Sequence, residues 1–508
     1  MLGSVLSYGL NGIKGYPVNV EVNSSDGIPA YETVGLPDMA VRESKERVRS
    51  AIANSGFPPV TGRITVNLAP ADTKKIGSIY DLPIALGILA AQGLIDNIKL
   101  QDHMVAGELA LSGEVRGICG VLPMVIDAFS KGIKNMVLPK ANASEASYIA
   151  GTKIIAVDSL NDAVGYLRGE KHISPYIPKV WNAQMCKYKV DFSEIKGQHG
   201  AKRAAEIAAA GGHNLLLIGS PGSGKTMIAK RMPTILPSLT FEEALEITKI
   251  HSVVELIDNE MGLTTKRPFR SPHHSASTVS LVGGGQNAMP GEISLAHRGV
   301  LFMDEFPEFR KDVLEALRQP LEDGEIKISR AAAKSTYPAD FMLIAAMNPC
   351  PCGYYGSRTK KCRCTPYQIQ RYQQRISGPM LDRIDRHVEM SDVGYKELSS
   401  CDEGEISAEI RIRVNQAREV QRQRYKGENI ICNSQLNDRN LIKYCRLDAS
   451  SAKIIEAAMN RMNLTARAYV RLLKVARTIA DLAGSDAIGA DHISEAIQYR
   501  SIEGKYWR

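Results

Sequence analysis

The sequence has no hydrophobic run long enough to cross a membrane and no leader of the secretory type. No apolar stretch in its 508 residues approaches the roughly 20 that a membrane helix needs. Residues 1–10 lack the basic start and the cleavage site of a secretory signal. We therefore expect a cytoplasmic protein with no membrane partner.

The sequence also lacks internal repeats, low-complexity tracts and a complete set of disulfide partners. Its nine cysteines are an odd number, so they cannot all pair, and in the cytoplasm we expect most of them to be reduced. A hydrophobic content of 44% and a charged content of 23% are typical of a globular protein. A chain of 508 residues is long for one core, which predicts two or more domains.

A strong charge of one sign is missing too. The formal net charge is +8, and residues 1–185 carry 17 basic and 17 acidic side chains. The basic surplus therefore lies entirely in residues 186–508. It permits a polyanionic partner, although so small a surplus does not by itself indicate one.

The order of the expected elements divides the chain into three domains. Residues 1–185 alternate strands with helices and predict an α/β domain, and residues 186–395 predict a second α/β unit. Two prolines in residues 174–178 mark the linker between them. Residues 396–508 predict an α-helical domain, with helices expected over residues 405–426, 451–463, 465–483 and 491–499.

A glycine-rich turn lies between the apolar strand 214–218 and a helix that begins near Lys225. Its spacing is G-x-x-x-x-G-K-[ST], in the strand-turn-helix context of a phosphate loop. Glycines let backbone N–H groups approach phosphate oxygens, and the helix N-terminus adds positive dipole. We expect the following residues to bind ATP: Gly219, Ser220, Pro221, Gly222, Ser223, Gly224, Lys225 and Thr226.

Two further apolar strands are expected to end in polar side chains suited to phosphate hydrolysis. The first leads to Asp304, which with Thr226 is expected to hold Mg²⁺. Its neighbour Glu305 can polarise the attacking water. The second strand leads to Asn348, whose amide can orient that water. A simple turn amide before Pro349 is the alternative for this asparagine.

Four of the nine cysteines form the pattern C-x-C-x₉-C-x-C. Four neighbouring thiolates could make a tetrahedral Zn²⁺ site, although a spacing of one residue is tighter than the usual two to four. Unligated thiols in a loop are the alternative. The loop also interleaves lysines and arginines with tyrosines, which suits single-stranded nucleic acid or a merely solvated surface. The four are Cys350, Cys352, Cys362 and Cys364.

Several longer motifs resemble those of the magnesium-chelatase-like AAA+ ATPases. The resemblance narrows to the YifB/ComM family, because the N-terminal domain also resembles the Lon-protease and ribosomal-protein-S5-like fold. The histidines within these motifs lack metal-ligand spacing, so we expect structural roles for them. The motifs are residues 271–274, 290–305, 346–353, 377–386 and 465–469.

The resemblance implies an AAA+ core with a helical lid that assembles into a ring, usually a hexamer. Lys225 and Thr226 match Walker A, Asp304 and Glu305 match Walker B, and Asn348 matches sensor 1. We expect Arg383 or Arg386, three residues apart on one helical turn, to be the arginine finger that reaches a neighbouring subunit. Arg467 matches the sensor 2 arginine, which contacts nucleotide from the lid. Surface ion pairs are the alternative for each arginine.

Three functions remain open from the sequence. The first is an ATP-driven motor acting on single-stranded or branched DNA, in which a basic hairpin over residues 325–330 projects into the ring's pore. The second is a chelatase-type or chaperone ATPase that remodels a protein without a DNA substrate. The third, a Lon-type peptidase, would need Ser78 as nucleophile with Lys74 or Lys75 as base. Because residues 81–83, at the comparable helix start, include no serine, we expect residues 1–185 to be a scaffold or ligand-gripping domain without peptidase activity.

Overall fold

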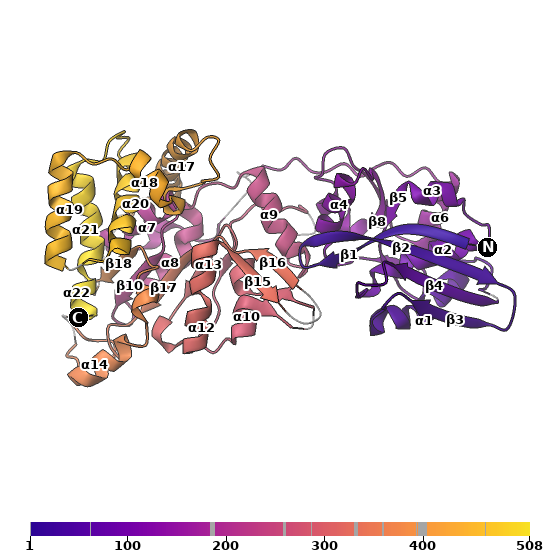
Figure 1. Cartoon of the computed structure of the whole chain (residues 1–508), viewed down its shortest axis with the longest axis horizontal. Helices are drawn as coiled ribbons and strands as arrows, with labels where there is room; N and C mark the ends of the chain where they lie inside the picture. Colours follow the sequence, from indigo (N-terminus) through magenta and orange to yellow (C-terminus); the bar gives the residue numbers. More distant parts are fainter. Residues whose placement is uncertain are drawn as a thin grey trace.

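The protein is elongated, with a large N-terminal sheet at one end and a group of helices at the other (Figure 1). A parallel sheet lies between them, which confirms the predicted fold class. The computed structural model describes residues 2–60, 62–182, 188–257, 261–285, 287–329, 334–357, 360–392, 394, 404–462 and 464–507. The predicted boundaries at residues 185/186 and 395/396 lie outside the described residues.

The N-terminal sheet has seven strands in the order β3-β4-β2-β1-β5-β8-β9. Strands β1 and β2 form a long antiparallel hairpin, and β5, β8 and β9 continue the sheet in parallel. Alternate residues of β1, β2 and β4 are buried, as one covered face requires. The strands are β1 (Leu2–Asn11), β2 (Lys14–Ser25), β3 (Ala30–Val34), β4 (Arg63–Ala69), β5 (His103–Val105), β8 (Asn135–Pro139) and β9 (Lys153–Val157); β6 (Glu108–Leu109) and β7 (Val115–Arg116) form a separate small hairpin.

Helix α2 runs over the predicted residues, Asp81–Ala91, and all of its side chains are buried. Its sequence is apolar on every face, which suits a helix enclosed by other elements. It approaches β1 closely, since a Cβ on Gly3 would lie 2.2 Å from the carbonyl oxygen of Gly87. The other helices of this domain are α1 (Met39–Asn54), α3 (Asn97–Gln101), α4 (Val121–Ser130), α5 (Ala143–Ala146) and α6 (Leu160–Arg168).

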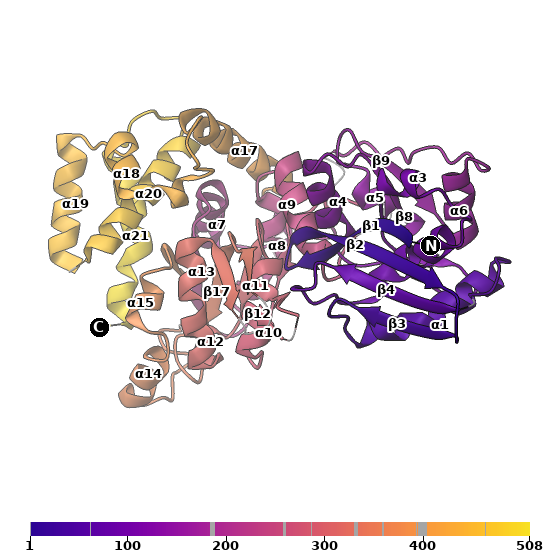
Figure 2. The same cartoon turned by 45° about the vertical axis from the view of Figure 1, so that its right-hand side comes forward.

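The N-terminal domain is joined to the rest of the chain by buried polar contacts at α9 (Phe241–Ser252), which lies beside α4 (Figure 2). The N–H of Gly120 donates to the carbonyl of Ser252 at 2.9 Å, and the Ser252 hydroxyl donates to Glu145 at 2.7 Å. Glu145 is buried, and its desolvation raises the pKa of the carboxyl. The Tyr148 hydroxyl adds a bond to the Met261 carbonyl at 2.8 Å.

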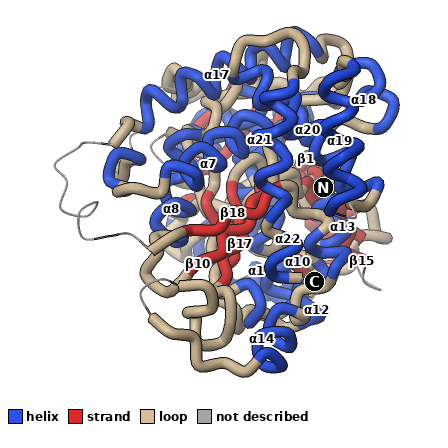
Figure 3. The backbone as a smooth tube through the Cα atoms, turned by 90° about the vertical axis from the view of Figure 1, so that its left-hand side faces the viewer, coloured by secondary structure: helices blue, strands red, loops and turns tan. Residues whose placement is uncertain are grey.

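The central sheet has five parallel strands in the order β11-β14-β17-β10-β18. Figure 3 shows β10, β17 and β18 side by side. The strands are β10 (Leu215–Gly219), β11 (Phe269–Arg270), β14 (Val300–Met303), β17 (Met342–Met347) and β18 (Arg386–Met390). The helices around them are α7 (His199–Gly211), α8 (Lys225–Ile235), α10 (Thr278–Val282), α11 (Glu292–Leu295), α12 (Lys311–Ala316), α13 (Arg318–Asp323), α14 (Pro366–Gln373) and α15 (Gly378–Leu381).

Two hairpins accompany the central sheet. Strands β12 (Gly283–Gly284) and β13 (Met289–Pro290) form a short one. Strands β15 (Glu325–Ser329) and β16 (Lys334–Pro338) form the predicted basic hairpin, in antiparallel register from Glu325↔Pro338 to Ser329↔Lys334. Its predicted residue Arg330 lies outside the described residues.

The C-terminal part is helical, as predicted. Thr465 caps α20 by accepting a hydrogen bond from the N–H of Ala468. Helix α20 packs against α7 and α21. The helices are α17 (Ser407–Arg424), α18 (Asp438–Tyr444), α19 (Ala449–Met462), α20 (Ala466–Leu482), α21 (Ala490–Ser501) and α22 (Glu503–Tyr506). Among the helices of the described residues, none has the length and apolar character that a membrane span requires.

Candidate nucleotide site

The parallel order of the central sheet brings the predicted site residues together. Strand β10 ends at Gly219 of the phosphate loop, β14 ends just before Asp304, and β17 ends just before Asn348. Parallel strands have their carboxyl ends at the same edge of the sheet, which is where ligands bind in open α/β folds. Because β17 lies between β14 and β10, Asn348 stands between the phosphate loop and the acidic pair.

Lys225 is folded into the phosphate loop at the start of α8. Its Nζ donates to the carbonyls of Gly219 and Ser220 at 2.7 and 2.9 Å, and to Asn348 Oδ1 at 3.1 Å. The side chain is buried, and desolvation lowers the pKa of its ammonium to about 8, against a smaller raising effect of Asp304. The predicted sensor and the Walker A lysine are therefore in direct contact.

Thr226 and Asp304 form the oxygen pair that was predicted to hold Mg²⁺. The Thr226 hydroxyl donates to Asp304 Oδ2 at 2.8 Å, and the other carboxylate oxygen accepts from the N–H of Glu305 at 2.9 Å. Hydroxyl and carboxylate oxygens are ligands that suit Mg²⁺. Glu305 has a left-handed backbone, with φ at +52°, and its side chain is 55% exposed at the same edge.

The phosphate loop is held by two residues that no sequence motif identifies. The side-chain amide of Gln198 donates to the carbonyls of Ser223 at 3.1 Å and Ser391 at 2.6 Å. Asp392, just after β18, accepts a hydrogen bond from the hydroxyl of Ser220. These contacts join residues 25 to 193 positions apart, so no local spacing could have revealed them.

The His274 side chain contacts the carboxylate of Glu305, the predicted catalytic base. Its Nδ1 is 3.1 Å from Glu305 Oε2. The ring packs on His273, with centroids 4.1 Å apart, and meets the edge of Phe309. A structural role was expected for His274, and the contact with Glu305 instead places it within the site.

The two candidate finger arginines do not share a helical turn, which corrects that prediction. Arg386 is the first residue of β18 and is completely buried in its own chain. Its guanidinium lies 3.8 Å from the ring centroid of Tyr499 and donates to the Ala204 carbonyl at 2.7 Å. Arg386 therefore stabilises the contact between core and helical domain and does not project toward a neighbour. Arg383 lies just after α15 and is ion-paired with Glu322.

Arg467 is exposed in the first turn of α20. One turn later, Arg471 is ion-paired at 2.8 Å with Asp385. Asp385 accepts from the N–H of Asn214, which precedes β10. This part of α20 therefore lies at the amino edge of the sheet, and the five residues of β10 separate the two edges by about 16 Å.

Arg383 lies at the same amino edge, because its carbonyl accepts from the side chain of Asn214 at 3.0 Å. The structure thus places both remaining arginine candidates opposite the phosphate loop of their own chain. Among the described residues, no hydrogen bond or ion pair joins Arg467 to that loop, as a lid residue of the same subunit would form.

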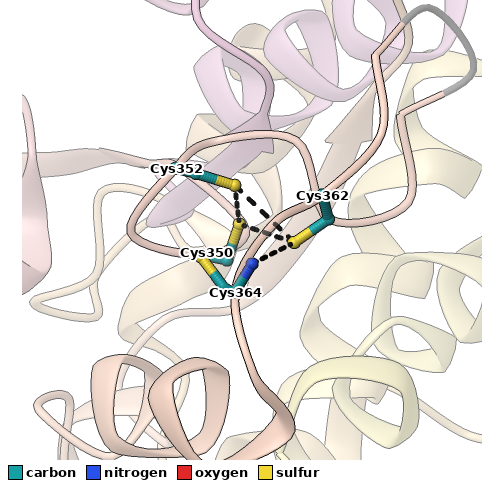
Figure 4. Close-up of side chains that lie close together, drawn as sticks. All are labelled: Cys350, Cys352, Cys362 and Cys364. Carbon is teal, nitrogen blue, oxygen red and sulfur yellow. Dashed lines mark hydrogen bonds between the residues drawn. The ribbon is translucent and has the colours of Figure 1, made fainter.

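The four cysteines of the C-x-C-x₉-C-x-C pattern form one cluster (Figure 4), in which all sulfurs lie within 4.8 Å of one another. The Cys350 sulfur is 3.4 Å from that of Cys352 and 3.7 Å from that of Cys362, and the last two are 3.6 Å apart. A tetrahedral site with Zn–S bonds of about 2.3 Å needs sulfurs about 3.8 Å apart. The residues therefore fit a Zn²⁺ ion.

Ser78, the candidate nucleophile of a Lon-type peptidase, is not hydrogen-bonded to a lysine among the described residues. The Ser78 hydroxyl donates to Glu108. Lys75 is buried, and its ammonium donates to the carbonyls of Pro70 and Thr73. Neither contact couples a nucleophile to a base, and no Ser78–lysine hydrogen bond occurs among the described residues.

Three family models match successive parts of the chain. Residues 191–398 match the family model described as magnesium chelatase, subunit ChlI, residues 20–142 match subunit ChlI of Mg-chelatase, and residues 404–500 match the ChlI C-terminal model. Competence protein ComM of Haemophilus influenzae is 45% identical over 508 residues, which cover 99% of this chain and 98% of the relative.

The chain belongs to the YifB/ComM family of magnesium-chelatase-like AAA+ ATPases. YifB of Escherichia coli, described as uncharacterized, is 45% identical over 97% of this chain and 96% of its own. A more distant relative in Arabidopsis thaliana, described as probable DNA helicase MCM9, is 23% identical over 73% of this chain and 52% of its own. Membership of this ATP-binding family agrees with the phosphate loop, Asp304 and Glu305 at one sheet edge.

Proposed function

We propose that this protein hydrolyses ATP to ADP and phosphate at the carboxyl edge of the central sheet. The observation that carries the proposal is the pair of contacts Lys225–Asn348 and Thr226–Asp304, which join three separate motifs and so support a phosphate site between them. The exposed carboxylate of Glu305 stands beside them. This constellation is what phosphoryl transfer to water needs.

In this mechanism the loop N–H groups and the start of α8 bind the β- and γ-phosphates. The Lys225 ammonium leaves its loop carbonyls and neutralises phosphate charge. Mg²⁺ bound with the nucleotide would be held by Thr226 and Asp304, and it would supply further charge neutralisation. Glu305 accepts the proton of the attacking water, and Asn348 orients that water by a hydrogen bond.

The site is completed, in this proposal, by a neighbouring copy of the chain. Arg383 and the start of α20, which carries Arg467, lie at the amino edge, and β10 separates this edge from the carboxyl edge by about 16 Å. An arginine at the amino edge can contact a nucleotide only when a neighbouring subunit places the carboxyl edge of its own sheet beside that arginine. Transition-state charge is then stabilised in trans. We propose a ring, and the family makes a hexamer the expected size.

We propose single-stranded or branched DNA as the substrate of this motor, with branch migration or helicase-like activity. Lys327 on the β15–β16 hairpin has a side chain that is 61% exposed. In the cysteine loop, the Lys360 ammonium lies 5.0 Å from the ring centroid of Tyr354. Cations beside aromatic rings suit a nucleic-acid strand. The names of two relatives, a competence protein and a probable DNA helicase, support the same class of substrate.

The test is the ATPase rate of the purified chain, alone and with single-stranded or forked DNA at low salt, together with its size in the presence of ATP. We expect a ring-sized species and stimulation by DNA. No DNA binding and no stimulation would contradict the DNA proposal. Stimulation by an unfolded protein alone would favour the alternative, a protein-remodelling ATPase.

We also propose that Cys350, Cys352, Cys362 and Cys364 hold a structural Zn²⁺. The separations among the sulfurs of Cys350, Cys352 and Cys362, 3.4 to 3.7 Å, match a tetrahedral S₄ site to within a few tenths of an ångström. The sulfur of Cys364 lies within 4.8 Å of these three, which also supports the proposal. Metal analysis of the purified protein should find one zinc per chain. A protein purified without chelator that contains no zinc would contradict the assignment.

A further inference from the structure

The cysteine cluster packs directly against the phosphate loop. Gly353 lies between the two cysteine pairs with φ at +83°, and a Cβ at this position would lie 2.5 Å from Cδ of Pro221. Gly353 is buried by this contact, although Pro221 itself is exposed to solvent. Only glycine allows both the left-handed backbone and so close an approach. The first cysteine pair therefore supports the middle of the phosphate loop.

A second contact joins the same two segments through Asp392. The hydroxyl of Ser357 donates to Asp392 Oδ2 at 2.7 Å, and the hydroxyl of Ser220 donates to Oδ1 of the same carboxylate. Ser357 belongs to the segment between the cysteine pairs, and Ser220 is the second residue of the phosphate loop. One carboxylate thus ties both segments to the end of β18.

The third connection between the cysteine loop and the nucleotide site is the backbone that joins them. Asn348, which accepts from the Lys225 ammonium, is only two residues before Cys350. The carbonyl of Pro349 between them accepts from the side chain of Gln373 at 3.2 Å. The position of the Asn348 amide therefore depends on how the cysteine loop leaves the end of β17.

We propose that the metal held by the four cysteines is a brace for the nucleotide site, which fixes Pro221, Ser220 and Asn348 through the cysteine loop. The proposal rests on the proposed ATP site and adds a metal dependence to it. Without the ion, residues 350–352 and 362–364 are joined by weak hydrogen bonds of their sulfurs and not by metal bonds, and the loop is held less firmly against Pro221. Displacement of about 1 Å at a phosphate site costs up to about a hundredfold in function.

The test compares the full-length wild type with the double variant Cys352→Ser/Cys362→Ser, at a fixed free Mg²⁺ concentration. Zinc content is measured by elemental analysis, and nucleotide affinity is measured with a fluorescent ATP analogue. We expect the double variant to contain no zinc and to bind the analogue about tenfold more weakly or worse. The control is Cys119→Ser, which changes an exposed cysteine outside the cluster and should leave zinc and affinity unchanged.

The variant Ser357→Ala tests the brace while the cysteine loop keeps its metal ligands and its fold. This variant keeps all four cysteines, so it should keep one zinc per chain, but it removes the bond to Asp392. We expect its affinity for the analogue to fall about three- to tenfold, the range for one hydrogen bond. If the double variant fails to fold, removing zinc from the wild type with a zinc-selective chelator should weaken binding, and added Zn²⁺ should restore it.

The outcomes distinguish the two proposals. A zinc-free protein that is folded by circular dichroism and binds the analogue as tightly as the wild type overturns the brace. A wild type without zinc overturns it as well. A wild type that contains zinc but neither binds nor hydrolyses ATP overturns the proposed function, on which the brace depends.

Discussion

ATP affinity is expected to fall as the pH rises through the pKa of Lys225. Desolvation by burial lowers the pKa of this ammonium from 10.5 to about 8. Only the protonated form neutralises a triphosphate. Bound nucleotide therefore favours the charged form, so above pH 8 binding must take up a proton and becomes weaker with each further rise.

The size of the effect follows from the pKa of Lys225. With a pKa of about 8, the ammonium is about nine-tenths protonated at pH 7 and about one-tenth protonated at pH 9. Affinity for ATP should therefore fall about tenfold between these values, which corresponds to about 1.4 kcal/mol. Below pH 7 Lys225 contributes no further change, because it is already charged.

The assay is titration with a fluorescent ATP analogue at several pH values from 7 to 9.5, with calorimetry in two buffers to count the proton taken up. The matched control is Lys225→Arg, whose guanidinium stays charged throughout this range. The control should bind more weakly at pH 7 but show no fall with pH. A wild type with constant affinity from pH 7 to 9.5 would refute the reasoning.

Three substitutions test the other groups. Glu305→Gln should still bind ATP but hydrolyse it about 10²–10⁴-fold more slowly in single-turnover assays, and normal hydrolysis would remove Glu305 as the base. Arg467→Ala should leave nucleotide affinity of the isolated chain unchanged and lower the ATPase rate of the assembled form about a hundredfold, whereas weaker binding by the isolated chain would place Arg467 in its own site. Arg386→Ala should lower the free energy of unfolding by about 3 kcal/mol in urea titrations, because it removes a buried cation stacked on Tyr499, and an unchanged midpoint would contradict this structural role.

The parts of the site that could be predicted are those with a local signature. The phosphate loop, Asp304 and Asn348 each follow an apolar strand directly, and parallel pairing then brings the strand ends to one edge. Helix α2 was also predictable, since residues 81–91 are apolar throughout and carry proline in the first turn.

The parts that could not be predicted depend on contacts between distant segments. His274 reaches Glu305 across 31 positions of sequence, and Gln198 reaches Ser391 across 193. Neither residue type has a spacing that predicts its partner. For Arg386 a family motif predicted a role that the structure does not support. The motif made Arg386 a candidate arginine finger beside Arg383, but tertiary packing turns its guanidinium inward onto Tyr499.

The two edges of the central sheet give the subunit a polarity. One edge carries the phosphate loop and Glu305, and the other carries Arg383 and Arg467. Under the proposed arrangement these unlike surfaces meet, so a twofold dimer, which joins two identical patches, cannot complete a site. Contacts of this heterologous kind either close into a ring or continue as a helical filament. The angle between neighbouring subunits, and not the strength of their contact, then decides whether every copy has a complete site.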